Sequence, residues 1–338
     1  MTEVTTPRQA LLEVKGLRTA FPGEDGPVVL VDRVSLSVHA GETLAVVGES
    51  GSGKTMTFLS VLGLVPRPGR VVAGEVRFGG VDLVQLAPAE LRAIRGAGVA
   101  MVFQDPLTAL NPVFTIGDQL VEVIRAHRPL RAAAARKLAI ETLERVHIPD
   151  PSRRVDDFPH QLSGGMRQRV LIAMAIALGP KVLVADEPTT ALDVTVQAQI
   201  LELLAELRAE LGMGMVLITH DLGLVAKHAE RVAVMYAGRV VETCRVEDGF
   251  ADARHPYTRS LLGSIPRLDG PPGEALPAIE GMPPNLAALP PGCPFEPRCF
   301  LGRGRETCRA SRPGLAATDR EGHASACHHW SELAEDAA

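Results

Sequence analysis

The sequence is poor in cysteine, in aromatic residues and in net charge. Its 338 residues include five cysteines and only 4% Phe, Trp and Tyr, and the formal net charge is −5. This balance gives no electrostatic field suited to a phosphate backbone, so we expect no nucleic-acid partner. A hydrophobic content of 46% with 22% charged residues is ordinary for a globular protein.

No apolar run is long enough to cross a bilayer. The most apolar stretch, residues 170–185, reads VLIAMAIALGPKVLVA and is interrupted at Gly179-Pro180-Lys181, whereas a spanning helix needs about 20 mostly apolar residues. A buried helix followed by a buried strand is predicted there instead. The N-terminal MTEVTTPRQALLEV lacks the basic and apolar regions of a secretory signal. We therefore expect a cytoplasmic protein.

Strands and helices are predicted to alternate along most of the chain. Residues 12–38 alternate apolar and polar side chains, with Gly and Pro between the runs, which is typical of antiparallel strands. Buried strands are predicted for TLAVVGES, KVLVADEP and GMVLITHD. Helices are predicted for TMTFLSVLGLV, TIGDQLVEVIRAH, RAAAARKLAIETLERV and VTVQAQILELLAELRAEL. This order predicts an α/β fold with a parallel sheet covered by helices.

The composition changes after about Arg239. Prolines and glycines crowd residues 266–313, as in GPPGEALPAIEGMPPNLAALPPGCPFEP, where long regular elements cannot form. The chain is also longer than a typical domain of about 100–200 residues. We predict one large domain over residues 1–240 and a separate Pro/Gly/Cys-rich extension over residues 241–338.

GESGSGKT, residues 48–55, matches the pattern G-x-x-x-x-G-K-S/T between a predicted strand and a predicted helix. Its glycines let backbone N–H groups face phosphate oxygens. Lys54 would reach the β and γ phosphates, and the Thr55 hydroxyl would ligate Mg²⁺. The predicted contacts to the nucleotide are Gly48, Ser50, Gly51, Ser52, Gly53, Lys54 and Thr55. Alone, the motif indicates only a nucleoside triphosphate.

VLVADEP, residues 182–188, places two carboxylates at the end of a buried strand. Asp186 could hold the Mg²⁺ shell. Glu187, the next residue, could orient or deprotonate the attacking water. A solvated loop start is the alternative interpretation, and the matching phosphate loop makes it less favoured.

LSGGMRQR, residues 162–169, resembles the signature segment of the ATP-binding subunits of ABC transporters. Alone it could be a Ser N-cap with a flexible lead-in. Further segments resemble motifs of the same family in the same order: TAFPGEDG with Phe21, MVFQDP with Gln104, TALD with Asp193, and LITHD with His220. The resemblance implies a P-loop NTPase (RecA-like) core, an antiparallel β subdomain, and an α-helical signature subdomain over about residues 105–170.

The resemblance also implies roles for single residues. The implied catalytic set is Glu187, His220 and Gln104. Gln104 would also be an Mg²⁺ ligand beside the attacking water, and His220 would lie near the γ-phosphate. Phe21 would stack on adenine, with ordinary packing as the alternative. The other implied nucleotide contacts are Ser163, Gly164, Gly165, Gln168 and Asp193.

The family works through partners. ATP lies between the phosphate loop of one ATPase subunit and the L-S-G-G segment of another, so this chain would need a second ABC ATPase subunit, identical or related. Two membrane permease subunits would dock near DPLTALNPVFTIGDQL, and an extracytoplasmic solute-binding protein would deliver the solute. The implied location is peripheral, on the cytoplasmic face of the cell (inner) membrane.

FQDPLTALNPVFTIGDQL and HPYTRSLLGSIPRL closely resemble the ATPase subunits of oligopeptide and dipeptide importers. That subfamily also serves nickel and some other solutes, so a nickel or other solute importer stays open as an alternative. A non-transport ABC ATPase is disfavoured, because the chain has neither a second cassette nor a long coiled-coil insertion. ATP-driven peptide uptake is the expected function.

Four of the five cysteines lie in the extension: Cys293, Cys299, Cys308 and Cys327. Cytoplasmic thiols are kept reduced, which disfavours disulfides. Structural zinc favours closer C-x(2–4)-C pairs, whereas iron–sulfur clusters tolerate varied spacing. From the residues alone, zinc, iron–sulfur and no metal all stay open, and His323, His328 or His329 could replace a ligand. The resemblance favours a structural 4Fe–4S cluster that pins the extension. Cys244 is expected to be an ordinary packed residue.

Overall fold

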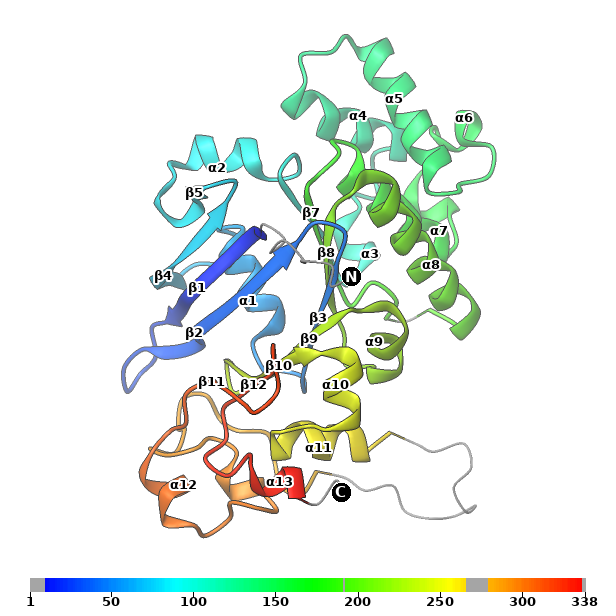
Figure 1. The fold of residues 1–338 in the computed structure, drawn as a ribbon. Helices are drawn as coiled ribbons and strands as arrows, with labels where there is room; N and C mark the ends of the chain where they lie inside the picture. Colours follow the sequence, from blue (N-terminus) through cyan, green and yellow to red (C-terminus); the bar gives the residue numbers. More distant parts are fainter. Residues whose placement is uncertain (1–9, 191, 266–278, 336–338) are drawn as a thin grey trace, which may run out of the picture.

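The computed structural model describes residues 10–190, 192–265 and 279–335, and two β-sheets organise them (Figure 1). The smaller sheet is antiparallel with strand order β2-β1-β4-β5. Its strands are β1 (Ala10–Phe21), β2 (Val28–His39), β4 (Arg70–Phe78) and β5 (Val81–Asp82). β1 pairs with both β2 and β4, with Val14 opposite Leu36 and Val76. The predicted antiparallel strands over residues 12–38 are confirmed.

The larger sheet has the order β11-β12-β10-β9-β3-β8-β7-β6. Its parallel strands are β3 (Thr43–Val47), β6 (Val99–Val102), β7 (Val182–Asp186), β8 (Gly214–Ile218) and β9 (Arg231–Tyr236). Every residue of β3, β7 and β8 is buried, as expected for a parallel sheet covered on both faces. The antiparallel continuation consists of β10 (Arg239–Arg245), β11 (Ala316–Ala317) and β12 (Ala324–Ser325).

Alternate side chains of the central strands serve two different hydrophobic cores. Val184 and Val216 point into a core shared with the antiparallel sheet and α1 (Lys54–Val61). Leu183 and Leu217 point the other way, into a core shared with the helices. Because successive strand side chains face opposite sides, one buried sheet fixes both the β subdomain and the helical cover.

The helical cover forms a subdomain and a supporting layer. The subdomain contains α3 (Pro106–Ala109), α4 (Ile116–His127), α5 (Ala132–Arg145), α6 (Pro151–Arg154), η2 (Pro159–Gln161) and α7 (Gly164–Ile176). Ile116, Leu120 and Ile124 recur at helical spacing and are fully buried, so α4 turns one apolar face toward its neighbours. The remaining helices of the cassette are η1 (Leu83–Gln85), α2 (Pro88–Ile94), α8 (Val194–Leu211) and α9 (Leu222–His228).

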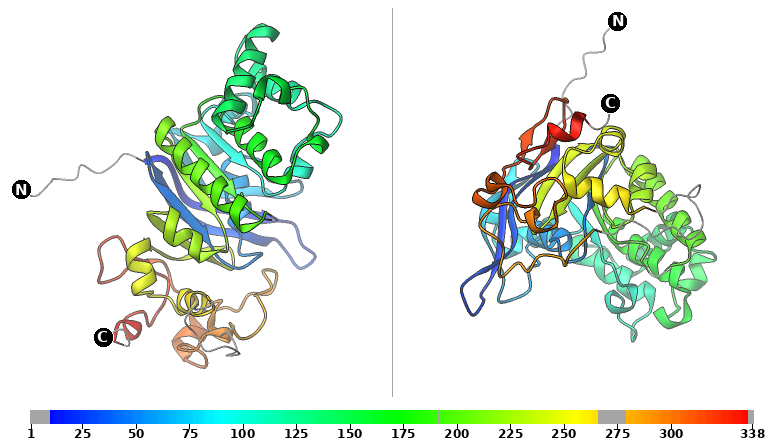
Figure 2. Two further views of the ribbon diagram at one scale, coloured as in Figure 1. Left: turned by 90° about the vertical axis from the view of Figure 1, so that its right-hand side faces the viewer. Right: turned by 90° about the horizontal axis from the view of Figure 1, so that it is seen from below.

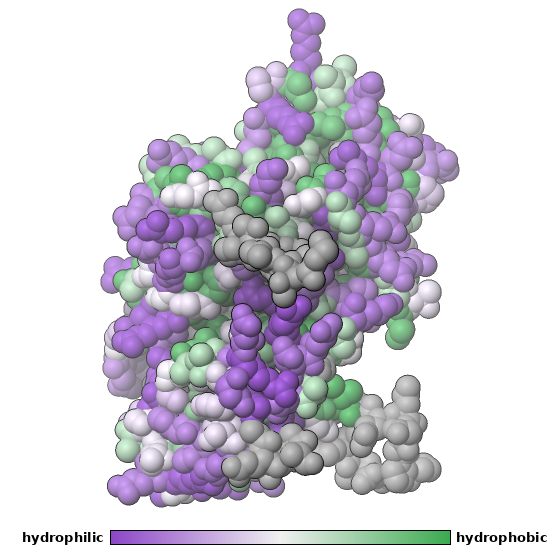
Figure 3. Space-filling view, viewed as in Figure 1, coloured by the Kyte–Doolittle hydropathy of each residue, from purple (hydrophilic) through white to green (hydrophobic). Residues whose placement is uncertain are grey.

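The apolar stretch 170–185 follows its prediction. Helix α7 ends at Ile176, Gly179 adopts a left-handed φ of 68°, and β7 begins at Val182. No helix among the described residues combines the length and apolar character needed to cross a membrane. On the face shown in Figure 3, apolar residues are interspersed with polar ones and form no continuous band.

The part of the chain that follows β10, here called the extension, lies at the opposite end of the molecule from α4, α5 and α6 (Figures 1 and 2). It contains α10 (Val246–Ala251), α11 (Pro256–Gly263), η3 (Glu296–Arg298), α12 (Glu306–Ala310) and α13 (Glu332–Glu335). Between residues 279 and 313 the structure has only the short η3 and α12, which agrees with the predicted lack of long elements there. Residues 266–278 lie outside the described part of the chain. The predicted boundary at 240 falls within β10.

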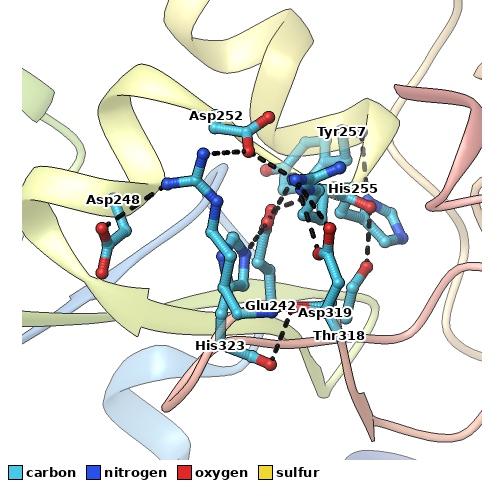
Figure 4. Close-up of polar contacts among 11 residues, drawn as sticks. Glu242, Asp248, Asp252, His255, Tyr257, Thr318, Asp319 and His323 are labelled. Carbon is cyan, nitrogen blue, oxygen red and sulfur yellow. Dashed lines mark hydrogen bonds and ion pairs between the residues drawn. The ribbon is translucent and has the colours of Figure 1, made fainter. Parts of the chain in front are cut away.

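A buried polar network joins β10 to the extension (Figure 4). Glu242 is fully buried and accepts hydrogen bonds from the backbone N–H groups of Arg254 (2.5 Å) and His255 (3.2 Å). Its Oε1 also lies 2.7 Å from Nε2 of His323. Asp252 pairs with Arg254 at 2.6 Å. One carboxylate of the sheet therefore holds both the start and the end of the extension.

Candidate active site

The phosphate loop joins β3 to α1 through glycines that no other residue could replace without strain. Gly48, Gly51 and Gly53 have φ values of 148°, 78° and 99°, in the region that favours glycine. A Cβ on Gly48 would collide with the carbonyl oxygen of Met235, and one on Gly53 would lie 2.8 Å from the carbonyl oxygen of Leu30. The loop is therefore packed tightly against β9 and β2.

Lys54 is held inside the loop. Its Nζ donates to the carbonyl oxygens of Gly48 (2.7 Å) and Glu49 (3.0 Å), and the residue is 6% exposed. Burial lowers the pKa of the ammonium, against the opposing effect of Glu187, Asp186 and Glu49. The Lys54 ammonium therefore lies beside the backbone N–H groups that would face phosphate.

Thr55 and Asp186, two of the three predicted Mg²⁺ ligands, lie side by side. The Thr55 hydroxyl donates to Oδ1 of Asp186 at 3.1 Å across 131 positions of the chain. Asp186 is 2% exposed, and burial raises the pKa of its carboxyl, partly offset by the bond from Thr55. Hydroxyl and carboxylate oxygens suit Mg²⁺, a hard cation that also keeps waters and phosphate oxygens in its shell.

The three predicted catalytic residues lie together, with Glu187 at the centre. Nε2 of Gln104 donates to Oε2 of Glu187 at 2.9 Å, and Nδ1 of His220 lies 3.3 Å from Oε1. Thr190, to which no role was assigned from the sequence, donates its hydroxyl to Oε2 at 2.9 Å. Glu187 has a φ of 44°, an uncommon conformation for a non-glycine residue that can mark a functional site.

A cavity of about 880 Å³ collects these groups. The phosphate loop, Gln104, Glu187 and His220 line it. Four further lining residues carry no motif signal: Leu30 of β2, Met56 of α1, and Pro283 and Leu286 of the extension. The extension therefore forms part of the wall of the candidate nucleotide site, which the sequence did not reveal.

Phe21, the predicted adenine contact, lies outside this cavity. It lines a separate hollow with Pro22, Pro68 and Arg70. Its ring covers Gly69 so closely that a Cβ there would overlap it, so the side chain packs on the loop before β4. Stacking of Phe21 on adenine stays a prediction.

The signature segment does not line the cavity built on Lys54. Ser163 caps α7, with its Oγ accepting the N–H of Met166 at 3.3 Å. Gly164 and Gly165 open α7, and a Cβ on Gly165 would lie 2.7 Å from Val196 of α8. Asp193 caps α8 by accepting the N–H of Val196 at 2.9 Å.

Gln168, the remaining predicted nucleotide contact of that segment, is 2% exposed within α7, and its Nε2 has no hydrogen-bond partner among the described residues. One chain thus keeps its phosphate loop and its signature segment apart. A site in which ATP lies between a phosphate loop and a signature segment would therefore need a second subunit.

The four cysteines of the extension line one small cavity of about 10 Å³, space for about one water-sized sphere. Two backbone N–H groups donate to their sulfurs: Gly302 to Sγ of Cys299 (3.0 Å) and His329 to Sγ of Cys327 (3.4 Å). Burial raises the pKa of all four thiols, that of Cys293 to about 11 and that of Cys327 to about 12.

No three His, Cys, Asp or Glu side chains within residues 10–190, 192–265 and 279–335 form a group that could hold a metal ion. The predicted metal centre is therefore not shown. The histidines predicted as alternative ligands contact other residues. Both ring nitrogens of His329 have partners, in Glu332 and Thr307, and Nε2 of His323 lies 2.7 Å from Glu242. Nε2 of His328 lies near Ser311. Cys244 is buried in a hydrophobic cluster, as expected.

Two family models match the chain. Residues 31–190 match the model described as ABC transporter. Residues 241–308 match the model described as oligopeptide/dipeptide transporter, C-terminal region. The two matches fall on either side of the boundary predicted at residue 240.

Curated relatives are similar over nearly the whole chain. A protein of Brucella melitensis named as a peptide import ATP-binding protein is 50% identical over 97% of this chain and 99% of its own length. The dipeptide transport ATP-binding protein DppD of Escherichia coli K12 is 49% identical over 95% of this chain and 97% of its own length.

Solved structures share the cassette fold. The ATP-binding cassette MJ0796, in a dimeric post-hydrolysis state with ADP and Pi, is 29% identical with a TM-score of 0.62, covering 70% of this chain and 98% of that one. The cbiO1 protein of Clostridium perfringens, part of the transporter complex cbiONQ, is 28% identical with a TM-score of 0.61, covering 72% of this chain and 91% of that one.

Proposed function

The chain belongs to the family of ABC transporter ATP-binding proteins, and from this premise we propose that it hydrolyses ATP to energise import of di- and oligopeptides. One observation carries the proposal: Lys54, Thr55 and Glu187 line one cavity, with Gln104 and His220 beside Glu187 and Asp186 hydrogen-bonded to Thr55. The chain that holds them is about half identical to peptide-import ATPases over nearly its full length.

Binding would begin at the phosphate loop. Lys54 would leave the carbonyl oxygens of Gly48 and Glu49 and move to the β and γ phosphates, while the loop N–H groups hold the remaining oxygens. Thr55 and Asp186 would hold Mg²⁺, which neutralises phosphate charge during hydrolysis. The adjacency of these two side chains supports that assignment.

Hydrolysis would centre on Glu187. Its carboxylate would orient a water molecule and accept its proton at Oε1 or Oε2 as the oxygen attacks the γ-phosphorus. The bond from the γ-phosphorus to the β–γ bridging oxygen would break, and ADP would leave with that oxygen. The amide of Gln104 and the hydroxyl of Thr190 fix this carboxylate by donating to Oε2. His220, whose Nδ1 lies 3.3 Å from Oε1, would contact the γ-phosphate.

A second ATPase subunit, identical or related, would complete the site by presenting its Ser163 segment or the equivalent. The separation of the signature segment from the Lys54 cavity within one chain supports this requirement. Gly164, Gly165, Gln168 and Asp193 would then act at the site of the other subunit. Closure of the pair on ATP and reopening after hydrolysis would drive transport.

Two permease subunits would dock beside Gln104, placing the protein on the cytoplasmic face of the inner membrane. The segment after Gln104 exposes large apolar side chains: Leu107 is 67% exposed, Val113 71% and Phe114 51%. Exposed apolar residues gathered on one segment are typical of a protein–protein contact. An extracytoplasmic solute-binding protein would supply the solute.

The test has two arms. Purified protein with MgATP should release phosphate, and vesicles containing the chain with its permeases and second ATPase should accumulate labelled dipeptide in an ATP-dependent manner. A cognate solute-binding protein that binds nickel but no peptide would favour the nickel-importer alternative. Absence of ATP hydrolysis from both the isolated and the assembled protein would refute the proposal.

We also propose that residues 241–338 form an extension whose four cysteines hold a 4Fe–4S cluster of structural role. The convergence of Cys293, Cys299, Cys308 and Cys327 on one cavity, with two N–H···S hydrogen bonds, supports the donor set. Thiolate ligation suits iron–sulfur clusters and zinc alike. At about 10 Å³ the cavity is smaller than a cluster, and no three of the described thiols are arranged to hold a metal ion. The thiols would therefore have to move apart to ligate a cluster.

Anaerobically purified protein should be brown and contain iron and sulfide in equal amounts, and a Cys299→Ser variant should lose both. The matched control is Cys244→Ser, since Cys244 is buried away from this cavity. A colourless protein with one zinc per chain would replace the cluster by zinc. A protein that contains no metal, and whose stability does not change when metal is added, would refute the proposal that this site holds a metal.

A further inference from the structure

The extension contacts the second residue of the phosphate loop. Arg298 forms a two-pronged ion pair with Glu49, with Nη1–Oε2 at 2.7 Å and Nη2–Oε1 at 2.9 Å, across 249 positions of the chain. The Glu49 N–H donates to the Tyr257 hydroxyl at 2.8 Å, across 208 positions. Both the charge and the backbone of Glu49 are therefore held by residues outside the cassette motifs.

Arg298 is itself fixed. Its side chain is 5% exposed, and its Nε donates to the carbonyl oxygen of Glu280 at 3.0 Å. The guanidinium lies 5.9 Å from the ring of Tyr236. Tyr236, Tyr257 and Phe295 pack together with ring centroids 4.6 to 5.4 Å apart. In a chain with only two tyrosines, both support this contact.

The contact bears on the charge that a nucleotide would meet. Glu49 lines the nucleotide cavity, and its carbonyl oxygen accepts from Lys54. An unpaired carboxylate there would repel the phosphates that Lys54 attracts. A bidentate arginine neutralises the carboxylate and also fixes its direction. Pro283 and Leu286, from the same extension, add to the wall of the cavity.

We propose that Arg298 and Tyr257 are positioning residues of the nucleotide site, through which the extension sets the affinity of the phosphate loop for ATP. The inference rests on the proposed function only in that the loop must bind ATP. Arg298 immediately precedes Cys299, and the turn of η3 places its N–H on the carbonyl oxygen of Phe295. A change in the cysteine segment would therefore reach the phosphate loop through Arg298, and through Tyr257, whose ring packs against Phe295.

The experiment measures the Kd of a fluorescent ATP analogue with Mg²⁺, and the KM and kcat of hydrolysis, in a double-mutant cycle on the full chain. Arg298→Gln should weaken binding by about ten-fold or more, because it leaves a half-buried carboxylate unpaired beside the phosphates. It should raise KM in proportion, with kcat changed by less than about three-fold.

Glu49→Gln should restore most of the affinity when added to Arg298→Gln, since it removes the unpaired charge. General damage to the extension would not be rescued in this way. Arg305→Gln is the matched control: Arg305 forms a comparable two-pronged pair with Glu332 (2.6 and 2.8 Å), within the extension and away from the loop. It should bind the analogue like the wild type.

Tyr257→Phe provides a milder second variant should Arg298→Gln fail to fold. It removes only the hydroxyl that accepts from Glu49, and should weaken binding about two- to five-fold. Unchanged affinity in a folded Arg298→Gln protein, or loss that Glu49→Gln does not relieve, would overturn the inference while leaving the proposed function intact. A wild-type protein that binds no ATP would overturn both.

Discussion

Replacing Glu242 with alanine is expected to loosen the extension from the cassette. Glu242 is fully buried on β10 and accepts from the N–H groups of Arg254 and His255 and from His323 (Figure 4). These partners lie at the start and near the end of the extension. No other side chain of the described residues accepts from both of those N–H groups.

The magnitude follows from what the substitution leaves behind. A buried donor deprived of its acceptor costs about 1–3 kcal/mol, and two backbone N–H groups and one imidazole lose theirs. The expected loss is therefore about 3–9 kcal/mol. With a urea m-value of about 2–3 kcal/mol per molar, the midpoint should fall by about 1–4.5 M.

The assay uses the only tryptophan of the chain. Trp330 lies in the extension, 5.9 Å from the Arg254 guanidinium, so its fluorescence reports on this region. In urea, Glu242→Ala should shift the fluorescence transition to lower concentration, and further than the far-UV circular dichroism transition, which is dominated by the cassette. Glu321→Ala, at an exposed position of the same extension, should shift neither. A fluorescence midpoint equal to that of the wild type would refute the reasoning.

Three further changes test the site and its surroundings. Glu187→Gln should lower the rate of phosphate release about 10²–10⁴-fold with ATP affinity kept; near-normal turnover would remove Glu187 as the base. Burial lowers the pKa of His255 to about 4, below the ordinary value of about 6.5. Between these two pH values the unfolded chain binds a proton that the folded chain does not. The free energy of unfolding should therefore fall as the pH drops below about 6.5, by about 2 kcal/mol at pH 5. Urea titrations at pH 7 and pH 5 should show this loss, and His255→Gln should reduce it. Gly48→Ala should abolish ATP binding, because its Cβ would collide with the Met235 carbonyl oxygen, whereas Gly41→Ala, at another positive φ but with open space around it, should bind ATP normally.

The parts of the site that the sequence predicted are those whose chemistry is local. Residues 48–55 carry their own strand, glycines and helix start, and Asp186-Glu187 follows a run of buried apolar residues. Side-chain periodicity sufficed for the sheet and for α4 and α5, because burial on one face imposes that pattern on neighbouring residues. The catalytic set of Gln104, Glu187 and His220 came from the family resemblance, whereas the contacts of Gln104 and His220 with the Glu187 carboxylate came from the structure.

Contacts between distant segments were decided by the tertiary structure alone. Nothing around Arg298 or Glu49 indicates that they pair, since the contact depends on how the extension docks against β9 and β10. The same docking brings Leu286 to the nucleotide cavity and the four cysteines to one small space. Phe21 faces a separate hollow because the loop before β4 lies against its ring. A sequence pattern records which face of an element is buried, whereas the partner it is buried against is set only when the whole chain packs.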